Sequence, residues 1–326
     1  MIVKDGVILR EIGGYIELDT YMLPMLHDNG ISLNCGRNAL AYILLAKNIK
    51  RLLIPYFLCD SVYQVCLKYN VEVDYYHICD TFFPQNVNIK DGEWIYIVNY
   101  YGQLSEDNIK MMQKQYNRII IDNAQAYFMK PVDGIDTIYT CRKFFGVPDG
   151  AFLYTNKNCE MQIPVDESYE RMRFLLGRYE KNATEFYPEY VLNNELFLDA
   201  PIKQMSRLTR NLLHGIDYDL VCNRRTENFR YLHEKLGSIN KLKLHVPDGA
   251  FMYPFCVDNG MIIRKKMHEK KIYIPVLWPS VLELCQKEEL EYNMVEDILP
   301  LPIDQRYDLD DMEYLYLNLM NCIKYQ

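Results

Sequence analysis

Hydrophobic and polar positions alternate between two patterns along the first half of the chain. Short apolar runs typical of buried β-strands recur from residue 51 to residue 155, and segments with apolar residues at helical spacing separate them. Ser105 is a favourable N-cap for one of these helices, with acidic residues directly after it. The expected strands are residues 51–55, 71–76, 94–99, 118–122, 136–140 and 151–155, and the expected helices are residues 36–48, 60–69 and 105–116.

This alternation predicts the α/β class, with a mostly parallel sheet covered by helices. A polar, tyrosine-rich stretch follows Asn156, and then a single long helical pattern runs from Met205 to about Leu236. We expect a large α/β domain over residues 1–205, and a bridging helix with a smaller C-terminal α/β domain over residues 206–326. In the second domain the pattern predicts a strand at 250–257, a basic helix at 261–271, an apolar stretch at 272–279 and a closing helix from residue 308.

The amino-acid composition of the chain argues against some classes of function. The chain has 326 residues, and 49% of them are hydrophobic, which is enough for a well-buried core. The net charge of −8 is spread along the chain, so no basic stripe indicates a nucleic-acid partner. Ten scattered cysteines form no Cys-x-x-Cys pair, and no apolar run reaches the roughly 20 residues of a membrane-spanning helix. We expect a cytoplasmic protein that acts on small molecules, without nucleic-acid or membrane partners.

Ligands of parallel α/β sheets bind beyond the carboxyl ends of the strands, and three segments place polar residues there. The first is "LNCGRNALAYIL", in which Gly36 precedes a helix whose free amides can bind an anion, with the cation of Arg37 beside them. A simple turn glycine is the alternative for Gly36. The first segment therefore indicates an anion site only when it is considered together with the other two segments.

The second segment is "RIIIDNAQAYF", in which an apolar strand ends in Asp122 and Gln125 follows three residues later. A carboxylate at the tip of a buried strand needs a cation or several hydrogen-bond donors, because burying it alone is costly. Capping of a following helix by Asp122 is the alternative interpretation.

The third segment is "YTCRKFFGVPDGAFLYTN", in which Lys143 follows a predicted strand. A lysine in a loop is ordinarily an exposed surface amine, and that alternative stays open from this segment alone. An anion site, a strand-end carboxylate and a lysine on neighbouring loops are together what pyridoxal phosphate (PLP) requires for its phosphate, ring nitrogen and aldehyde.

With these three segments in order, the chain resembles the DegT/DnrJ/StrS-type sugar aminotransferases, which have the PLP-dependent, aspartate aminotransferase-like fold type I. "NCGRNALAYIL" resembles the family's Ser-Gly-Thr-x-Ala-Leu phosphate loop, and "VNYYGQLSEDNIKMM" resembles its His-x-Tyr-Gly segment. "IIIDNAQAYF" is similar to Glu-Asp-x-x-Gln-Ala, and "YTCRKFFGVPDG" to Ser-Phe-x-x-x-Lys with its downstream turn. "EKKIYIPVLWP" and "DILPLPIDQRYDLDDMEYLYLNL" resemble segments of the family's small domain.

The resemblance implies a role for each matched residue. Lys143 would form the Schiff base with PLP and move the proton during transamination, Asp122 would hold the ring nitrogen protonated, and Gln125 would contact the phenolic oxygen. It also implies an amino acid donor such as glutamate, a nucleotide-linked keto sugar as acceptor, a role in polysaccharide or amino-sugar biosynthesis, and a homodimer with the active site at the subunit interface. The other expected cofactor contacts are Gly36, Arg37, Asn38, Phe57 and Thr140.

Some positions depart from the family pattern. Ile138 stands where a phosphate-binding serine is usual, with Arg37 or Thr140 as possible replacements, and Cys59 stands where a ring usually stacks on the cofactor. Tyr56 or Phe57 are the candidates for that ring. Asn99 replaces a histidine, Leu277 and Trp278 replace a His-Tyr pair, and the family's Asn-Tyr-Arg segment has no clear equivalent.

Two other functions stay open at this point. A non-catalytic or regulatory protein with the same fold would account for the missing serine and ring. A nucleotide-sugar glycosyltransferase could use Asp217 and Asp219 as a metal-binding Asp-x-Asp, although this tripeptide is common and lies within a predicted helix.

Overall fold

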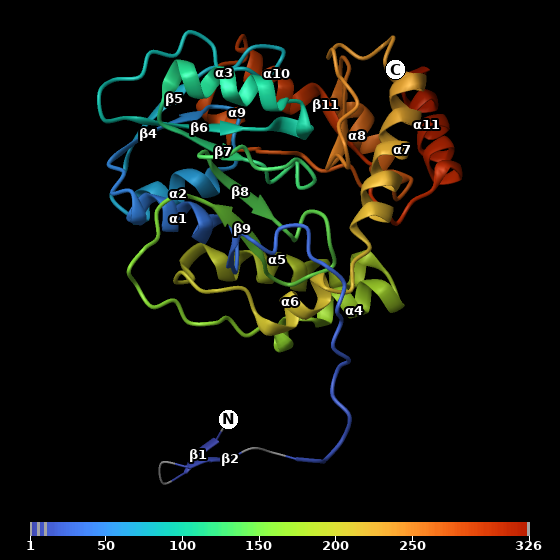
Figure 1. The fold of residues 1–326 in the computed structure, drawn as a ribbon. Coiled ribbons are helices and arrows are strands. Elements are labelled where there is room, and N and C mark those ends of the chain that lie inside the picture. The colour runs from blue at the N-terminus through green and yellow to red at the C-terminus, as the bar shows by residue number, and fades with distance from the viewer. Residues whose placement is uncertain (1, 5–6, 10–11, 325–326) are drawn as a thin grey trace.

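The computed structural model describes residues 2–4, 7–9 and 12–324, and a seven-stranded sheet forms its centre (Figure 1). Four neighbouring pairs in this sheet are parallel, and the two pairs at the β3 edge are antiparallel. The predicted mostly parallel sheet is confirmed. In spatial order the strands are β3 (Ile31–Leu33), β9 (Ala151–Tyr154), β8 (Asp136–Thr140), β7 (Ile119–Asp122), β6 (Trp94–Val98), β4 (Arg51–Pro55) and β5 (Glu72–Tyr76).

All six strands predicted in the first half of the chain are present, each within one residue of its predicted ends. The central strands consist almost entirely of buried apolar residues because helices or loops cover both faces of a parallel sheet. The strand β3 was not predicted, since three residues are too short for an alternation pattern to appear.

The three predicted helices of this region are confirmed as α1 (Gly36–Ala46), α2 (Asp60–Lys68) and α3 (Glu106–Tyr116). Ser105 caps α3 as expected: its hydroxyl accepts a hydrogen bond from the Asn108 amide at 3.1 Å, and the Asn108 side chain accepts one from the Ser105 amide at 2.9 Å. This reciprocal capping box satisfies two amides that the helix itself leaves unpaired.

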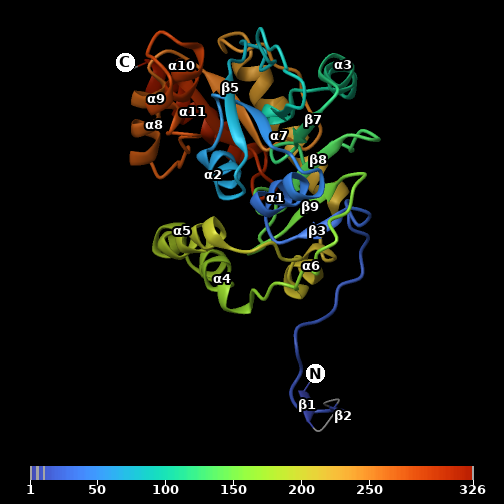
Figure 2. The same ribbon diagram turned by 90° about the vertical axis from the view of Figure 1, so that its left-hand side faces the viewer.

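The polar stretch after Asn156 contains a helical hairpin that the sequence pattern did not reveal. A short 3-10 helix, η2 (Tyr169–Arg171), precedes α4 (Arg173–Glu180) and α5 (Ala183–Asp199), which pack against each other beneath the sheet (Figure 2). Their buried apolar side chains are few, namely Phe174, Phe186 and Phe197, so the amphipathic pattern is weak.

The predicted single helix from Met205 to Leu236 is wrong. The chain forms α6 (Arg207–Leu213) and then α7 (Tyr218–Leu236), separated by a turn that contains Gly215. Asp217 caps α7 by accepting a hydrogen bond from the Leu220 amide at 2.9 Å. The first aspartate of the Asp-x-Asp tripeptide therefore has a structural role as a helix cap.

The C-terminal part pairs two antiparallel strands, β10 (Met252–Cys256) and β11 (Ile298–Pro302), and covers them with helices (Figure 1). The predicted basic helix is α8 (Gly260–Glu269) and the predicted closing helix is α11 (Leu309–Lys324), while β11 was not predicted. Residues 272–279 contain no helix or strand. The short helices α9 (Val281–Leu284) and α10 (Leu290–Asp297) complete this part.

Two buried apolar clusters are relevant to the predicted division at residue 205. One lies between α7, α8, α11 and the β10–β11 pair. The other lies around the large sheet, and it also includes Trp278, Val281 and Met294 from the C-terminal part. The boundary at residue 205 stays a prediction, and the terminal residues of both predicted domains lie outside the described residues.

Near the N-terminus, β1 (Ile2–Lys4) and β2 (Val7–Leu9) form an antiparallel pair that lies away from the sheet in both views (Figures 1 and 2). Among the described residues, none of the helices combines the length and the apolar character required to cross a lipid bilayer.

We expect Ser105→Ala to lower the free energy of unfolding by about 1 kcal/mol, because it removes the side-chain acceptor at the start of α3. Urea unfolding followed by circular dichroism measures this loss. Ser280→Ala is the matched control, since Ser280 precedes α9 without a capping hydrogen bond from its side chain. Equal unfolding midpoints for the two variants would contradict the capping role.

Candidate active site

The carboxyl ends of five parallel strands lie at one edge of the sheet. In the strand register Asp122 lies beside Val98 on one side and Ile138 on the other, so β6 and β7 end together and β8 continues for two residues beyond them. The Asn99 amide, just after β6, donates a hydrogen bond to the Asp122 carbonyl at 3.0 Å. This is the edge at which parallel α/β sheets bind ligands.

Gly36 brings the N-terminus of α1 to the same edge. A Cβ atom at position 36 would lie 2.8 Å from Cγ2 of Thr140, the last residue of β8. Side chains do not tolerate so close a contact, so the absence of a side chain at position 36 permits this approach. The helix start and the end of β8, about a hundred positions apart in sequence, are therefore in direct contact.

Asp122 is 9% exposed at the end of β7, and its carboxylate accepts a hydrogen bond from the Ala124 amide at 2.8 Å. No helix follows it, so the interpretation of Asp122 as a helix N-cap is wrong. Among the described residues Asp122 takes part in no ion pair. Burial, and then the charge of Asp122, raise the pKa of Tyr96 well above its usual value. The carboxylate thus has no cationic partner among the described side chains and can pair with a cationic group of a ligand.

Gln125 is almost fully buried, and its orientation is fixed. Its Oε1 accepts a hydrogen bond from the Tyr101 amide at 2.7 Å, within the turn η1 (Tyr100–Gly102) that follows β6. Tyr101 adopts a left-handed backbone conformation with φ of 53° in that turn. Since the acceptor oxygen is occupied, Nε2 faces away from this bond and forms no hydrogen bond to any described residue.

Lys143 lies three residues beyond the end of β8, in a turn closed by hydrogen bonds from the Phe144 and Phe145 amides to the Cys141 carbonyl. Its side chain is exposed, and Nζ lies 5.6 Å from the ring centroid of Phe251. No ion pair or hydrogen bond of the Lys143 side chain is present among the described residues. The loop that carries Lys143 begins at the sheet edge where Asp122 lies, and the amine has no carboxylate partner among the described residues.

The two phenylalanines that follow Lys143 are buried and anchor its turn. Their rings lie 5.4 Å (Phe144) and 5.0 Å (Phe145) from the ring of Tyr127, with centroids as the reference points. Aromatic pairs at these separations add to the free energy gained by burial. The aromatic pair in the sequence therefore fixes the backbone that carries the lysine.

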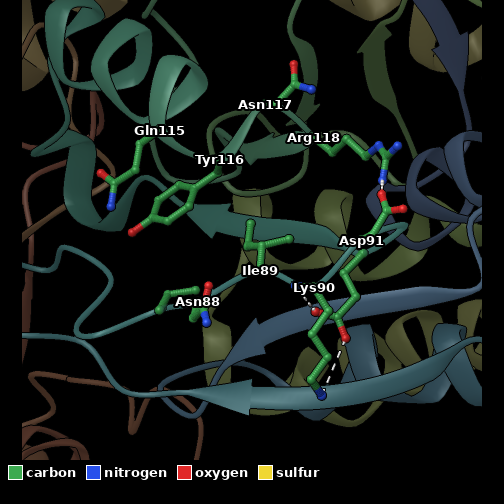
Figure 3. A pocket seen from close by; sticks show the side chains of 10 residues that line it. Asn88, Ile89, Lys90, Asp91, Gln115, Tyr116, Asn117 and Arg118 are labelled. Atoms are coloured by element: carbon green, nitrogen blue, oxygen red, sulfur yellow. Dashed lines mark hydrogen bonds and ion pairs between the residues drawn. The ribbon is translucent and has the colours of Figure 1, made fainter.

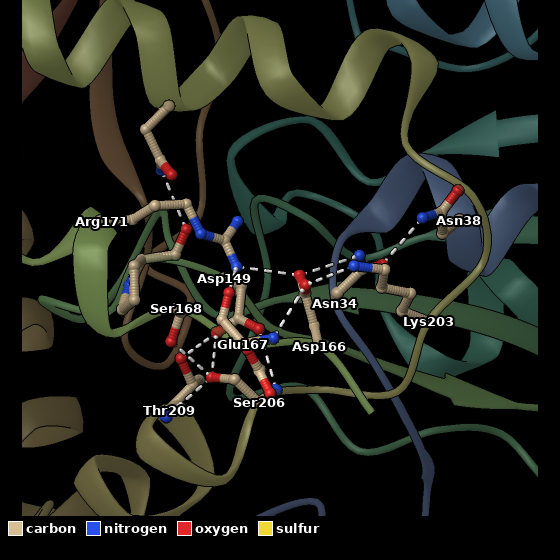
Figure 4. Close-up of polar contacts among 12 residues, drawn as sticks. Asn34, Asn38, Asp149, Asp166, Glu167, Ser168, Arg171, Lys203, Ser206 and Thr209 are labelled. Carbon is tan, nitrogen blue, oxygen red and sulfur yellow. Dashed lines mark hydrogen bonds and ion pairs between the residues drawn. The ribbon is translucent and has the colours of Figure 1, made fainter. Parts of the chain in front are cut away.

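Asp149, in the Pro-Asp-Gly turn after Lys143, is a structural residue that sequence reasoning missed. It is fully buried and accepts hydrogen bonds from the Ser206 amide and hydroxyl, both at 2.9 Å, and from the Thr209 hydroxyl (Figure 4). Burial raises its pKa, and these hydrogen bonds oppose the rise. The carboxylate joins the lysine loop to the start of α6, and a turn signal alone does not reveal such a partner.

Two buried donors near the start of α1 have no partner in the part of the chain that the structure describes. They are Nε of Arg37 and Oγ1 of Thr140, from the two segments that Gly36 brings into contact. The first turn of α1 contains no acidic residue. Buried donors are normally paired, so this cluster has the character of an anion site.

Asn38 and the candidate stacking rings are engaged in contacts within the protein. Nδ2 of Asn38 donates to Oδ1 of Asn34 and to the Pro201 carbonyl, both at 2.8 Å. Phe57 is buried against Trp278, with ring centroids 4.6 Å apart, and Tyr56 stacks on Tyr75 and on the imidazole of His77. Cofactor contacts of Asn38 and Phe57 stay predictions.

A pocket of about 580 Å³ lies elsewhere, at the amino ends of β6 and β7 (Figure 3). Its lining comes from residues 87–93 and 115–118, and it contains the ion pairs Arg118–Asp91 at 3.6 Å and Lys90–Glu93 at 3.8 Å. None of the residues predicted for the active site lines it. The pocket is at the sheet edge opposite to the strand ends described above.

No family model and no curated protein sequence matches this chain. Solved structures do match it. NtdA from Bacillus subtilis with bound cofactor PMP has a TM-score of 0.65 at 15% identity, over 90% of this chain and 73% of that chain. The putative sugar aminotransferase Spr1654 from Streptococcus pneumoniae in its PLP form has a TM-score of 0.64 at 14% identity, over 92% and 89%. A DegT DnrJ EryC1 StrS aminotransferase from Brucella abortus has a TM-score of 0.61 at 15% identity, over 89% and 85%.

At this level of identity the matches show a shared fold. The chain has the α/β fold type I of PLP-dependent aminotransferases, with the mostly parallel seven-stranded sheet at its centre. The fold implied by the sequence resemblance is confirmed.

We expect Gly36→Ala to lower the free energy of unfolding by about 1–3 kcal/mol, because its methyl group would displace Thr140 and the end of β8. Urea titration of the purified variant measures the change. Gly146→Ala is the matched control in the lysine loop, where the nearest atom to the new Cβ is a Leu175 methyl at 4.0 Å. An unchanged midpoint for Gly36→Ala would show that α1 can move away without cost.

Proposed function

We propose that the protein is a PLP-dependent aminotransferase that moves an amino group from an amino acid, glutamate as the expected donor, to a nucleotide-linked keto sugar in amino-sugar or polysaccharide biosynthesis. The observation that supports the proposal is that one sheet edge carries Asp122, the oriented amide of Gln125, the start of α1 and the loop of Lys143, and that among the described residues neither Asp122 nor Lys143 takes part in an ion pair. Support for the substrate class comes from the similar structures, which include proteins named as sugar aminotransferases.

The residues present fit the parts of PLP, which supplies an electron-accepting ring for carbanion chemistry. Asp122 would hold a proton on the ring nitrogen, since its buried carboxylate has no cationic partner among the described side chains. The Nε2 atom of Gln125 would donate to the phenolic oxygen, because its Oε1 is held by the Tyr101 amide. The start of α1, Arg37 and Thr140 would bind the phosphate.

Lys143 would bind the aldehyde and then carry the proton to and from the α-carbon of the amino acid. A base must reach both positions, and the Lys143 side chain is free of hydrogen bonds to described residues while its turn is anchored by Phe144 and Phe145. A rigid turn with a mobile amine is suited to this role, because the backbone keeps its position while the side chain moves.

The finer features follow from the family resemblance. We propose a cytoplasmic homodimer with the active site at the subunit interface, a large PLP-binding domain over residues 1–205 and a smaller domain over residues 206–326. Exposed apolar side chains on the α4–α5 hairpin, among them Leu176, Tyr187 and Leu192, are compatible with a subunit interface.

Lys143→Ala is expected to abolish the visible absorbance that the purified protein acquires with PLP, because the covalent bond to the lysine is lost. Absorbance spectra with and without added PLP measure this. Lys157→Ala, at an exposed lysine in the loop after β9, is the control and should keep the wild-type spectrum. A wild-type protein that stays colourless with PLP would favour the non-catalytic alternative.

Asp122→Asn should keep the cofactor bound but slow amino transfer from glutamate by roughly 100-fold or more, because an amide cannot supply the charge that stabilises a protonated ring nitrogen. The asparagine oxygen can still accept the hydrogen bond from the Ala124 amide, so the local fold is retained. Stopped-flow absorbance after mixing with glutamate measures the rate. Asp133→Asn, at an exposed position between β7 and β8, is the control, and a near-normal rate in Asp122→Asn would refute the assigned role.

A further inference from the structure

Arg142, the residue before Lys143, follows Thr140 by two positions, and the Thr140 side chain packs against Gly36, the residue before Arg37. The charges of Arg37 and Arg142 both act on the thiol of Cys35, which is the N-cap of α1. Burial, with a smaller contribution from the charge of Arg37, lowers the pKa of Arg142. A guanidinium from the first turn of α1 and one from the lysine loop therefore lie in one region at the edge of the sheet.

Neither arginine forms an ion pair with a carboxylate among the residues that the structure describes. The positive end of the α1 dipole adds to their charge, and the first turn of α1 offers no acidic side chain. Like charges in a partly buried region repel each other and lose hydration, so the arrangement is unfavourable without an anion. Nε of Arg37 and Oγ1 of Thr140 are also buried there without hydrogen-bond partners in the described part of the chain.

The α5 helix holds Arg142 in place. An Nη atom of Arg142 donates a hydrogen bond to Oδ1 of Asn194, and its guanidinium lies 4.8 Å from the ring centroid of Phe197. Arg171 lies 5.3 Å from the same ring, and its own guanidinium is paired with Asp166 at 2.9 Å (Figure 4). The hydrogen bond and the ring contact are to neutral groups and orient the Arg142 guanidinium. The charge of Asp149 also favours the charged form of Arg142, although the two form no ion pair among the described residues.

The position that the family resemblance assigns to a phosphate-binding serine is Ile138, which is 1% exposed and offers no donor. We propose that Arg142 takes over this function and, together with Arg37, binds the phosphate group of the cofactor between two guanidiniums. The planar fork of each arginine can donate two hydrogen bonds to phosphate oxygens, and the Thr140 hydroxyl supplies a further donor. The inference rests on the proposed function for the identity of the ligand.

With this assignment, the α4–α5 hairpin is a part of the active site because it positions Arg142. Asn193 of α5 donates to the Pro148 carbonyl at 2.9 Å, and the next residue accepts from Arg142, so the helix contacts the lysine loop on both sides of Lys143.

The test compares PLP with pyridoxal, which lacks the phosphate, as ligands of the full-length protein. Arg142→Met keeps a long side chain and removes the charge. We expect it to weaken PLP binding by roughly 10- to 100-fold, as for loss of a charge-assisted hydrogen bond, and to change pyridoxal binding by less than about threefold. Absorbance titration of the lysine-bound cofactor gives both dissociation constants. Equal losses for the two ligands, or no loss for either, would overturn the proposal.

Two further variants separate phosphate binding from structure. Arg171→Met removes the other guanidinium that lies against the Phe197 ring, and it should leave the preference for PLP over pyridoxal unchanged if Arg142 acts on phosphate. Arg142→Lys keeps the charge without the fork, and it should give an intermediate preference. The Arg142→Lys variant also provides the test of phosphate binding if Arg142→Met does not fold. If Arg142→Lys has the full wild-type preference for PLP over pyridoxal, the planar geometry of the guanidinium is not used for phosphate binding.

A second ligand distinguishes failure of this inference from failure of the proposed function. Inorganic phosphate should raise the melting temperature of the wild-type protein and should raise that of Arg142→Met less. If neither PLP nor pyridoxal binds Lys143 but phosphate still stabilises only the wild type, the proposed function fails while the two-arginine anion site stands. Equal stabilisation of both proteins by phosphate would refute the role of Arg142.

Discussion

The contact between Gly36 and Thr140 is the constraint on which the candidate active site depends. It places the start of α1 against the end of β8, and the parallel register then aligns Asp122 of the neighbouring strand with the same edge. Anything larger than glycine at position 36 would separate the helix from the strand. The site is therefore assembled by close backbone packing, and the loop that carries Lys143 begins where this packing ends.

Charge without a partner is the second common feature of this edge. Asp122 is a buried carboxylate outside any ion pair of the described residues, and Arg37 and Arg142 are partly buried cations that also form no ion pair with a described residue. Proteins rarely retain such groups, because the desolvation cost is repaid only by an opposite charge. A ligand with a cationic end and an anionic end would pair with both the carboxylate and the two arginines. PLP is such a ligand, because it has a protonated ring nitrogen and a phosphate.

The supports of the site come partly from the matched segments, which contain Tyr127 and Asp149, and partly from α5, which carries none of the matched motifs. Tyr127 anchors the phenylalanines after Lys143, Asp149 joins the loop to α6, and α5 contacts the same loop through Asn193 and Asn194. The lysine loop is thus held on three sides while the amine itself is left without a hydrogen bond to any described residue. This division between a fixed backbone and a free side chain suits a group that must exchange partners.

The sequence by itself determined every strand of the central sheet except β3, because buried strands are continuous apolar runs and their helices follow at regular spacing. It also identified Lys143, Asp122 and Gly36 as candidates at strand and helix ends. It did not determine the break between α6 and α7, the α4–α5 hairpin or the position of Arg142. The break between α6 and α7 depends on Asp217, which caps α7 within a continuous helical pattern. The hairpin depends on three buried phenylalanines in an otherwise polar stretch. The position of Arg142 depends on Asn194 and Phe197, which lie some fifty residues away in the sequence. Local periodicity carries no information about such partners, so only the tertiary structure could place them.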